Sequence, residues 1–140
     1  MTICLPVDMS PFDALASKEE RGLRQMVFKC VHHSKVKLED MQESGAEGIK
    51  VRWLIKEDDG APNFAMRLFE IEPKGHSPLH SHHWEHEVYV LEGNCQVKCD
   101  SEKANASAEY VVFIPPNAKH QFANKGKSTL RFLCLVPHHK

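Results

Sequence analysis

Four histidines stand in two short segments of the chain, and together they could bind one metal ion. His80, His82 and His86 lie in the first segment, and His120 lies in the second. In an extended strand, the side chains of His80 and His82 point to the same face and lie about 6.6 Å apart. Two imidazole groups so placed can converge on one cation, and imidazole is a common metal ligand.

His86 must approach the other two by a bend of the chain. It lies four residues beyond His82, which is about 13 Å in a straight strand and too far for ligands that each reach about 2.1 Å. We therefore predict a bend at residues 83–85. A helical zinc site of the H-E-x-x-H type is the alternative, because His82 and His86 are four residues apart. The segment lacks that glutamate and Pro78 lies just upstream, so the strand interpretation is favoured.

The elements that must position these histidines are strands. Strand-like patterns cover residues 49–57, 64–72, 86–92, 94–100, 109–114, 120–125 and 128–136. Turn-forming residues interrupt them at 58–63, 73–75, 93–94 and 124–126, and a proline-asparagine turn at 115–117 delivers His120 at the start of a strand. Many short strands at this spacing predict an antiparallel barrel or jelly roll.

The first part of the chain lacks these strand patterns. Ser17 and Glu20 form a capping-box pattern that predicts a helix from Ser17 to about Cys30. Residues 34–48 are predicted to be a polar connection. We see no repeat and no second domain.

The two histidine segments resemble the motifs of the cupins. The first cupin motif is G-x5-H-x-H-x(3 or 4)-E-x6-G, and the second is G-x5-P-x-G-x2-H-x3-N. The matching residues are His80, His82, Gly93, Pro115, His120 and Asn124. The third ligand departs from the motif: six residues before Gly93 stands His86 instead of glutamate. The other permitted spacing would select Glu87, with only five residues before Gly93, and we prefer His86.

Three glycines of these motifs are replaced. Lys74 and Glu109 stand where the two motifs begin, and Asn117 stands at the second glycine of the second motif. Asparagine tolerates positive φ next best after glycine, so the turn at Asn117 can survive. Glu109 fits its motif glycine position less well than Asn117 does.

A closer resemblance is to the small prokaryotic manganese cupins that have a four-histidine site. It rests on residues 61–69, 80–87 and 132–137 and covers about 49–137. It implies an all-β cupin double-stranded β-helix over 49–140, preceded by an N-terminal extension over 1–48 that has one helix. It also implies a homodimer and one divalent transition metal per chain, with manganese favoured over iron, nickel, copper or zinc.

The same resemblance implies two candidate catalytic residues. Arg67 would face the cavity, where it could hold a carboxylate or enolate by bidentate hydrogen bonding, although a solvent-facing arginine is an equal alternative. Cys134 lies on a strand face that looks at the metal, as a redox-sensitive or supporting thiol; the alternative is an ordinary core cysteine. Trp84, Phe122 and Phe132 are expected to line the pocket.

Composition restricts the partners. A formal charge of −1 and a pI of about 6.8 do not favour nucleic acid or an anionic membrane, since both need a concentrated basic surface. No run of about eighteen apolar residues is present, and residues 1–8 lack the basic start of a signal peptide. The cytoplasm is therefore the expected location, and five cysteines, an odd number, fit reduced thiols better than a disulfide framework.

Four neutral histidines leave two positions open on an octahedral ion, which is the property of a catalytic site. The first hypothesis is an oxygen- or peroxide-using, dioxygenase-like oxidoreductase that acts on a small organic molecule. The second is a sugar-type isomerase or lyase, which needs only Lewis acidity and would turn over without oxygen. The third is a non-catalytic metal- or ligand-binding module. A DNA-linked sensor is less favoured because residues 1–48 offer no helix-turn-helix pair.

Overall fold

Nine strands make up most of residues 28–138, the part of the chain that the computed structural model describes. They are β1 (Glu39–Asp40), β2 (Glu47–Ile55), β3 (Phe64–His76), β4 (His86–Glu92), β5 (Asn94–Cys99), β6 (Glu102–Ser107), β7 (Val111–Ile114), β8 (His120–Asn124) and β9 (Leu130–Pro137). Two short 3-10 turns, η2 (His33–Lys35) and η3 (Glu57–Asp59), precede β1 and follow β2. No helix in this part of the chain is long and apolar enough to cross a membrane.

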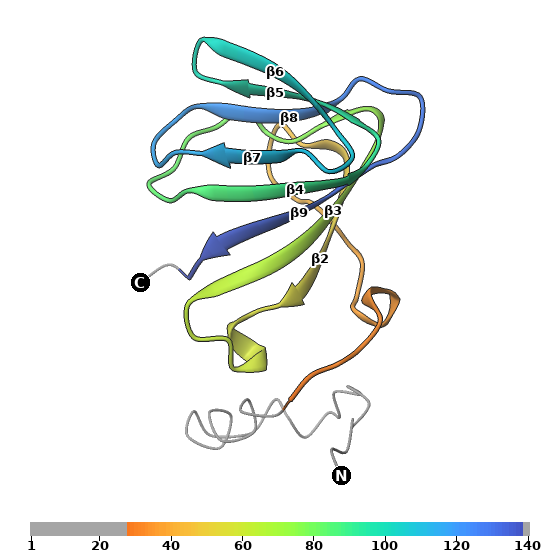
Figure 1. Ribbon diagram of the computed structural model, residues 1–140, viewed down its shortest axis with the longest axis vertical. Helices are drawn as coiled ribbons and strands as arrows, with labels where there is room; N and C mark the ends of the chain where they lie inside the picture. Colours follow the sequence, from red (N-terminus) through yellow and green to blue (C-terminus); the bar gives the residue numbers. More distant parts are fainter. Residues whose placement is uncertain (1–27, 139–140) are drawn as a thin grey trace.

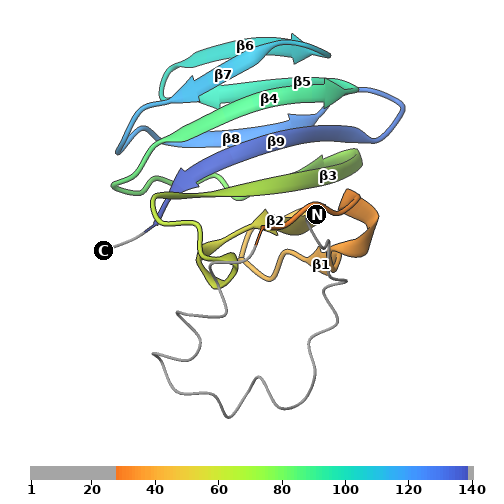
Figure 2. The same cartoon turned by 60° about the horizontal axis from the view of Figure 1, so that its bottom comes forward.

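The strands pair antiparallel and curl into a nearly closed barrel (Figures 1 and 2). Their hydrogen-bonded order is β6-β5-β8-β3-β9-β4-β7, with β2 on β3 and β1 on β2. The long strand β3 joins the two parts of the barrel, because residues 64–71 pair with β9 while His76 pairs with Ala123 of β8. The all-β barrel predicted from the sequence is confirmed.

The core lies between the inner faces of the strands, and alternation along each strand decides which side chains enter it. In β9 the buried residues are Leu130, Phe132, Cys134 and Val136, and the residues between them are only half-buried. The ring of Phe132 packs against Phe69 and Phe122, with centroids 5.3 and 5.2 Å away. Aromatic pairs of this kind stabilise a core beyond the area that they bury.

The sequence patterns miss two strands. β1 lies within residues 34–48, which were predicted to be a polar connection. β6 contains neither β-branched nor aromatic residues, and only Ala106 in it is fully buried. It forms because every residue of β6 has a partner in β5, from Glu102 opposite Cys99 to Ser107 opposite Asn94. Tertiary pairing here outweighs intrinsic strand propensity.

The strand break predicted at residues 73–75 is wrong, because β3 continues through it to His76. The pairing with β2 jumps from Ile49 opposite Ile71 to Glu47 opposite His76, so the extra residues form a bulge. Gly75 is required inside it: a Cβ atom there would lie 2.8 Å from the carbonyl oxygen of Glu47.

Three residues that replace motif glycines keep the glycine conformation. The φ angles are 71° at Lys74, 71° at Glu109 and 69° at Asn117. This left-handed conformation costs a residue with a Cβ atom roughly 1 kcal/mol. The turn at Glu109, the weaker fit in the sequence, therefore keeps the backbone shape of the motif without its glycine.

The helix expected from Ser17 to about Cys30 lies outside the described residues, except for its last three positions, which are not helical. The segment that follows is tied to the barrel. Nζ of Lys29 donates to the carboxylate of Asp59 at 2.8 Å and to the carbonyl of Leu54 at 2.9 Å. Residues near position 30 therefore lie against the end of β2.

Candidate metal centre

The four histidines of the two motifs come together in the barrel: one ring nitrogen from each lies within 4.8 Å of those from the others. His86 begins β4 and His120 begins β8. His80 forms an isolated bridge with His120, with backbone N···O distances of 3.2 and 2.9 Å. The chain bends at residues 83–84, as predicted, and this bend returns His86 to His82.

Backbone carbonyls orient two of the rings. Nδ1 of His82 donates to the carbonyl of Trp84 at 2.8 Å, and Nδ1 of His120 donates to the carbonyl of Ala118 at 2.9 Å. A carbonyl oxygen can only accept, so Nδ1 carries the proton in both rings. The unprotonated Nε2 atoms are then left to bind a cation, which is how metal-binding histidines are usually held.

The inward nitrogens fit a metal ion. Nε2 of His82 and Nε2 of His86 lie 2.8 Å apart, and two nitrogens bound at right angles, each about 2.1 Å from one ion, would be about 3.0 Å apart. Nε2 of His120 is buried and has no hydrogen-bond partner among residues 28–138. Because a buried polar atom without a partner is costly, a shared cation would satisfy it. The four-histidine group could therefore hold a divalent transition metal, for which imidazole is a suitable ligand.

The buried histidines are neutral at physiological pH. Burial, followed by the positive charge of Arg67, lowers the pKa of His86 to about 2. Burial also lowers the pKa of His82 to about 4 and lowers the pKa of His120. Neutral imidazole is the form that binds metal, so these three rings need not lose a proton to do so at pH 7.

The metal-free protein should lose stability as the pH falls below about 6.5. The pKa of His86 is about 2 in the folded protein, against 6.5 ordinarily. Between these values the unfolded chain binds one more proton than the folded protein, so the free energy of unfolding rises with pH. The slope from this residue is at most about 1.4 kcal/mol per pH unit. Urea denaturation between pH 6.5 and 5 measures it.

His86→Leu provides the control for this pH dependence. In the variant, the free energy of unfolding should change less steeply with pH, because the contribution of His86 is removed while those of the other groups remain. If the variant and the natural sequence show the same slope, His86 does not titrate as described.

Arg67 and Cys134 lie opposite each other on β3 and β9, directly behind His86. Nη2 of Arg67 lies 3.1 Å from Sγ of Cys134 and 3.3 Å from Nδ1 of His86, and Sγ lies 3.3 Å from the same Nδ1. The guanidinium group also packs over the rings of Trp53 and Phe69, 5.3 and 4.9 Å from their centroids. Burial raises the pKa of Cys134, although Arg67 opposes this, so the side chain is a thiol at neutral pH.

A cavity of about 180 Å³ opens beside the histidines. Its lining includes the three expected aromatic residues, Trp84, Phe122 and Phe132, together with Arg67 and Cys134. The ring of Trp84 stacks on His82 at a centroid distance of 3.9 Å. Met41 and Glu43 also line the cavity, and the sequence patterns do not point to them. They precede β2, far from either motif in the sequence, and the pairing of β2 with β3 brings them to the site.

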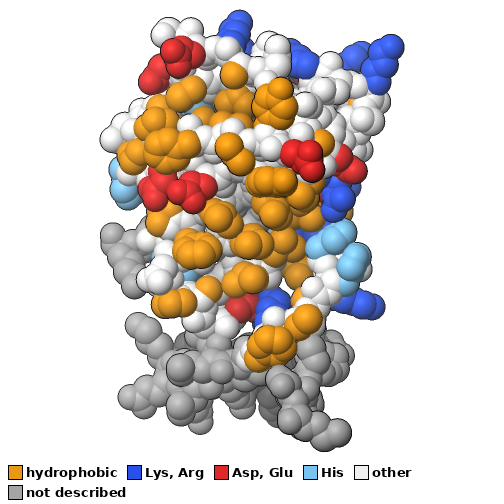
Figure 3. Space-filling view, viewed as in Figure 1, with side chains coloured by type: hydrophobic (Ala, Val, Ile, Leu, Met, Phe, Trp, Pro, Cys, Tyr) orange, Lys and Arg blue, Asp and Glu red, His pale blue; other side chains and the backbone are white. Residues whose placement is uncertain are grey.

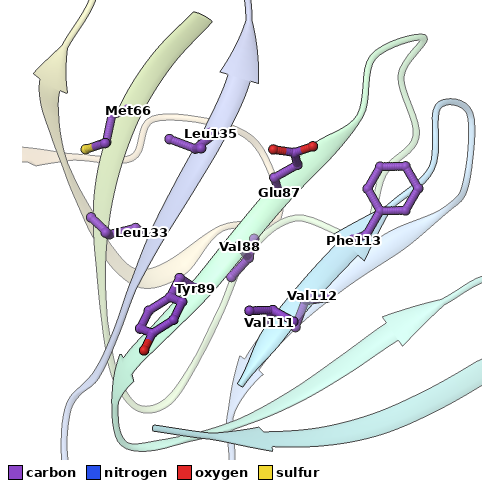
Figure 4. A pocket seen from close by; sticks show the side chains of 9 residues that line it. All are labelled: Met66, Glu87, Val88, Tyr89, Val111, Val112, Phe113, Leu133 and Leu135. Carbon is purple, nitrogen blue, oxygen red and sulfur yellow. The ribbon is translucent and has the colours of Figure 1, made fainter. Parts of the chain in front are cut away.

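Glu87, the alternative third ligand, faces away from the histidines. His86 is buried, whereas the next residue of β4, Glu87, is exposed. Figure 4 shows Glu87 among the apolar side chains that line a pocket on the outside of the barrel. Of the two candidates, the structure brings only His86 to the other three histidines.

The fold and this cluster of histidines are those of a known class of barrel. The sequence profile named Cupin_2, cupin domain, matches residues 67–136, which is half of the chain and includes all four histidines. The chain belongs to the cupin family, as the two motifs imply.

Similar proteins carry different names. A sequence relative, 1-methylthio-D-xylulose 5-phosphate methylsulfurylase of Rhodospirillum rubrum, is 34% identical over 71 residues, or 51% of this chain and 46% of that protein. Among solved structures, the polyketide cyclase RemF of Streptomyces resistomycificus is 37% identical with a TM-score of 0.75, covering 79% of this chain and 80% of that one. A cupin-2 domain of R. rubrum is 24% identical with a TM-score of 0.71, covering 80% and 76%, and supports the fold alone. The matched stretch spans less than half, 46%, of the length of the methylsulfurylase, and the same share of an uncharacterized protein of Methanocaldococcus jannaschii that is 35% identical over 57 residues, or 40% of this chain.

Proposed function

We propose that this cupin is a metal-dependent enzyme that acts on a small organic molecule. The observation that carries the proposal is the cluster of four inward histidines at the wall of a cavity of about 180 Å³. His80, His82, His86 and His120 would hold one divalent ion, manganese first, with iron, nickel, copper or zinc as alternatives. When bound, the ion would supply Lewis acidity and, if it is redox-active, a partner for electron transfer.

In this proposal Arg67 binds the substrate and Cys134 positions its neighbours. Arg67 lines the cavity beside the histidines, so its guanidinium could hold a carboxylate or enolate oxygen of a bound substrate. Its packing over Trp53 and Phe69 fixes the plane of the group. The neutral thiol of Cys134 contacts both Arg67 and His86 and would keep these two side chains in position.

Two reaction classes fit this site. An oxygen- or peroxide-using, dioxygenase-like oxidoreductase is supported by the all-imidazole ligand set, which suits redox-active metals. Lewis-acid chemistry on a carbonyl-containing substrate is supported by the relatives, one named a polyketide cyclase and one named for a ketose phosphate. Activation of a carbonyl needs a Lewis acid and no oxygen. We place the Lewis-acid class first because both relatives are named for compounds that contain a carbonyl group.

The dependence of turnover on oxygen separates the two classes. Protein loaded with manganese would be incubated with a panel of polyketide-like and ketose-phosphate compounds, with and without oxygen, and the products identified by mass spectrometry. A product formed equally in both conditions supports the Lewis-acid class, and substrate loss coupled to oxygen uptake supports the oxidoreductase. Compounds that bind at the site but are never converted would contradict an enzymatic role and leave a binding module.

We also propose that the chain forms a homodimer through its outer apolar face. Hydrophobic side chains gather on the face of the barrel that is turned toward the viewer in Figure 3. Tyr89 of β4 and Val111 and Phe113 of β7 are exposed, and they line the pocket of Figure 4. Within residues 28–138, Glu87 is the only charged residue that lines this pocket, and β7 beside it pairs on one side only. An apolar face next to a free strand edge is a surface that proteins usually cover.

Sedimentation of the natural sequence and of Phe113→Asp tests this interface. The natural sequence should sediment as a dimer and the variant as a monomer, while Lys103→Asp on the exposed strand β6 should change nothing. A natural sequence that sediments as a monomer would contradict the proposal.

The cytoplasmic location remains a proposal as well. It rests on the five cysteines of the sequence, of which the four in the described part are free thiols.

A further inference from the structure

We propose that Glu43, on the turn between β1 and β2, is a positioning residue of the metal centre and acts through His80. The inference rests on the metal centre proposed above. It assigns to that centre a residue from the stretch that the sequence patterns describe as an extension.

The carboxylate of Glu43 lies next to a ligand histidine. Its Oε2 atom is 3.4 Å from Nδ1 of His80, and the side chain lines the same cavity as the four histidines. The Nδ1 atoms of His82 and His120 are held by backbone carbonyls. The Glu43 carboxylate lies at ion-pair distance from Nδ1 of His80, and a proton held on Nδ1 by this carboxylate would leave Nε2 of His80 for a cation.

The turn that carries Glu43 is held in place by the barrel. The N–H of Met41 donates to the carbonyl of Ile49 at 3.1 Å, and the N–H of Ala46 donates to the carbonyl of Glu43 at 3.1 Å. Gly45 has a φ of 89° and lies against Pro78: a Cβ atom there would be 3.7 Å from the Cα atom of Pro78. Pro78 precedes His80 by two residues, so the turn and the first histidine segment contact each other at two points.

Charge distinguishes Glu43 from the partners of the other histidines. The partners of His82 and His120 are neutral carbonyls, and the partners of His86 are the thiol of Cys134 and the cationic Arg67. Among the described residues that line the cavity, Glu43 is the only carboxylate. A carboxylate that accepts from Nδ1–H increases the electron density at Nε2 and strengthens it as a ligand.

The carboxylate of Glu43 partly restores the negative charge that is missing at the third ligand position. The cupin motif has a glutamate where this chain has His86, so the four histidines bring no negative charge to a divalent ion. Glu43 supplies one negative charge from outside the ligand set, through the ring of His80. Because the side chain of Glu43 is 56% exposed, its effect should fall at the low end of the roughly 10- to 100-fold range for such outer partners.

Titration of the metal-free protein with Co²⁺ tests the proposal, because the ion reports both affinity and ligand field by its visible absorption. Glu43→Ala should weaken Co²⁺ binding about tenfold and shift the absorption bands. Glu47→Ala is the matched control. Glu47 is also exposed and lies 3.5 Å from a histidine, His76, that is not in the cluster, so both readouts should stay unchanged.

A double-mutant cycle shows whether Glu43 acts through His80. In a His80→Ala background, Glu43→Ala should produce no further loss of affinity, because the ring through which it acts is absent. A further tenfold loss there would make Glu43 an independent ligand and overturn the positioning role. Natural protein that binds Co²⁺ with an affinity and spectrum unchanged by Glu43→Ala would also overturn it, and natural protein that binds no Co²⁺ would instead overturn the metal centre itself.

Discussion

Replacing His120 by alanine should weaken binding of a divalent metal by more than about 100-fold while the barrel stays folded. Loss of an outer partner of a ligand alone typically costs 10- to 100-fold, and loss of a ligand should cost more. The ring of His120 is central, with its centroid 4.9, 4.8 and 4.9 Å from those of His80, His82 and His86. Elemental analysis of the purified variant measures the metal, and circular dichroism measures the fold.

His76→Ala provides the matched control for this experiment. His76 lies in the same part of the sequence but outside the cluster, so its removal should leave the metal content unchanged. Full metal occupancy in His120→Ala, or equal losses in both variants, would remove His120 from the site.

Exchanging His86 for glutamate should keep an ion bound but lower the Mn(III)/Mn(II) potential by more than about 100 mV. For a unit negative charge about 4 Å from the ion, the interaction strengthens by about 4 kcal/mol for each positive charge that the ion gains, at an effective dielectric constant near 20. That energy exceeds 100 mV for a one-electron couple. The adjacent guanidinium of Arg67, 3.3 Å from Nδ1 of His86, will offset part of the added charge.

Protein-film or mediated redox titration of the manganese-loaded variants measures this shift. His86→Gln is the neutral control, because it changes the ligand atom without adding a charge, and its potential should move much less. An unchanged potential in His86→Glu would argue that position 86 does not contact the ion.

The sequence predicts the barrel and the meeting of the four histidines because both depend on local patterns. The spacing of His80 and His82 places two rings on one strand face, and the need to bring His86 back predicts the bend that the structure has at residues 83–84. The buried alternation of β9 is also visible in the sequence, since Leu130, Phe132, Cys134 and Val136 are every second residue.

What the sequence does not predict depends on pairing between distant segments. Glu43 and Met41 reach the cavity because β2 pairs with β3, and no motif marks them. β6 exists because β5 offers it partners, not because its residues favour a strand. The residues at 73–75 form a bulge rather than a break, because β2 continues to pair on both sides of them.

The glycine positions show a different limit. A motif specifies residue types, whereas the fold requires a backbone conformation. Residues other than glycine can adopt that conformation at some cost in free energy. Lys74, Glu109 and Asn117 all have positive φ, so departures from the motif at these positions do not mark departures from the structure. The proposed division at residues 48 and 49 stays a prediction, and the contact of Glu43 with His80 crosses it.

Elemental analysis of untagged protein, purified without added metal, is the most direct test of the claim that four histidines hold one ion with part of its surface open. The expected result is about one transition-metal ion per chain, mainly manganese, that is lost together with any of the four histidines. Protein that contains no transition metal, and takes up none from a solution of manganese, iron or zinc, would contradict the account.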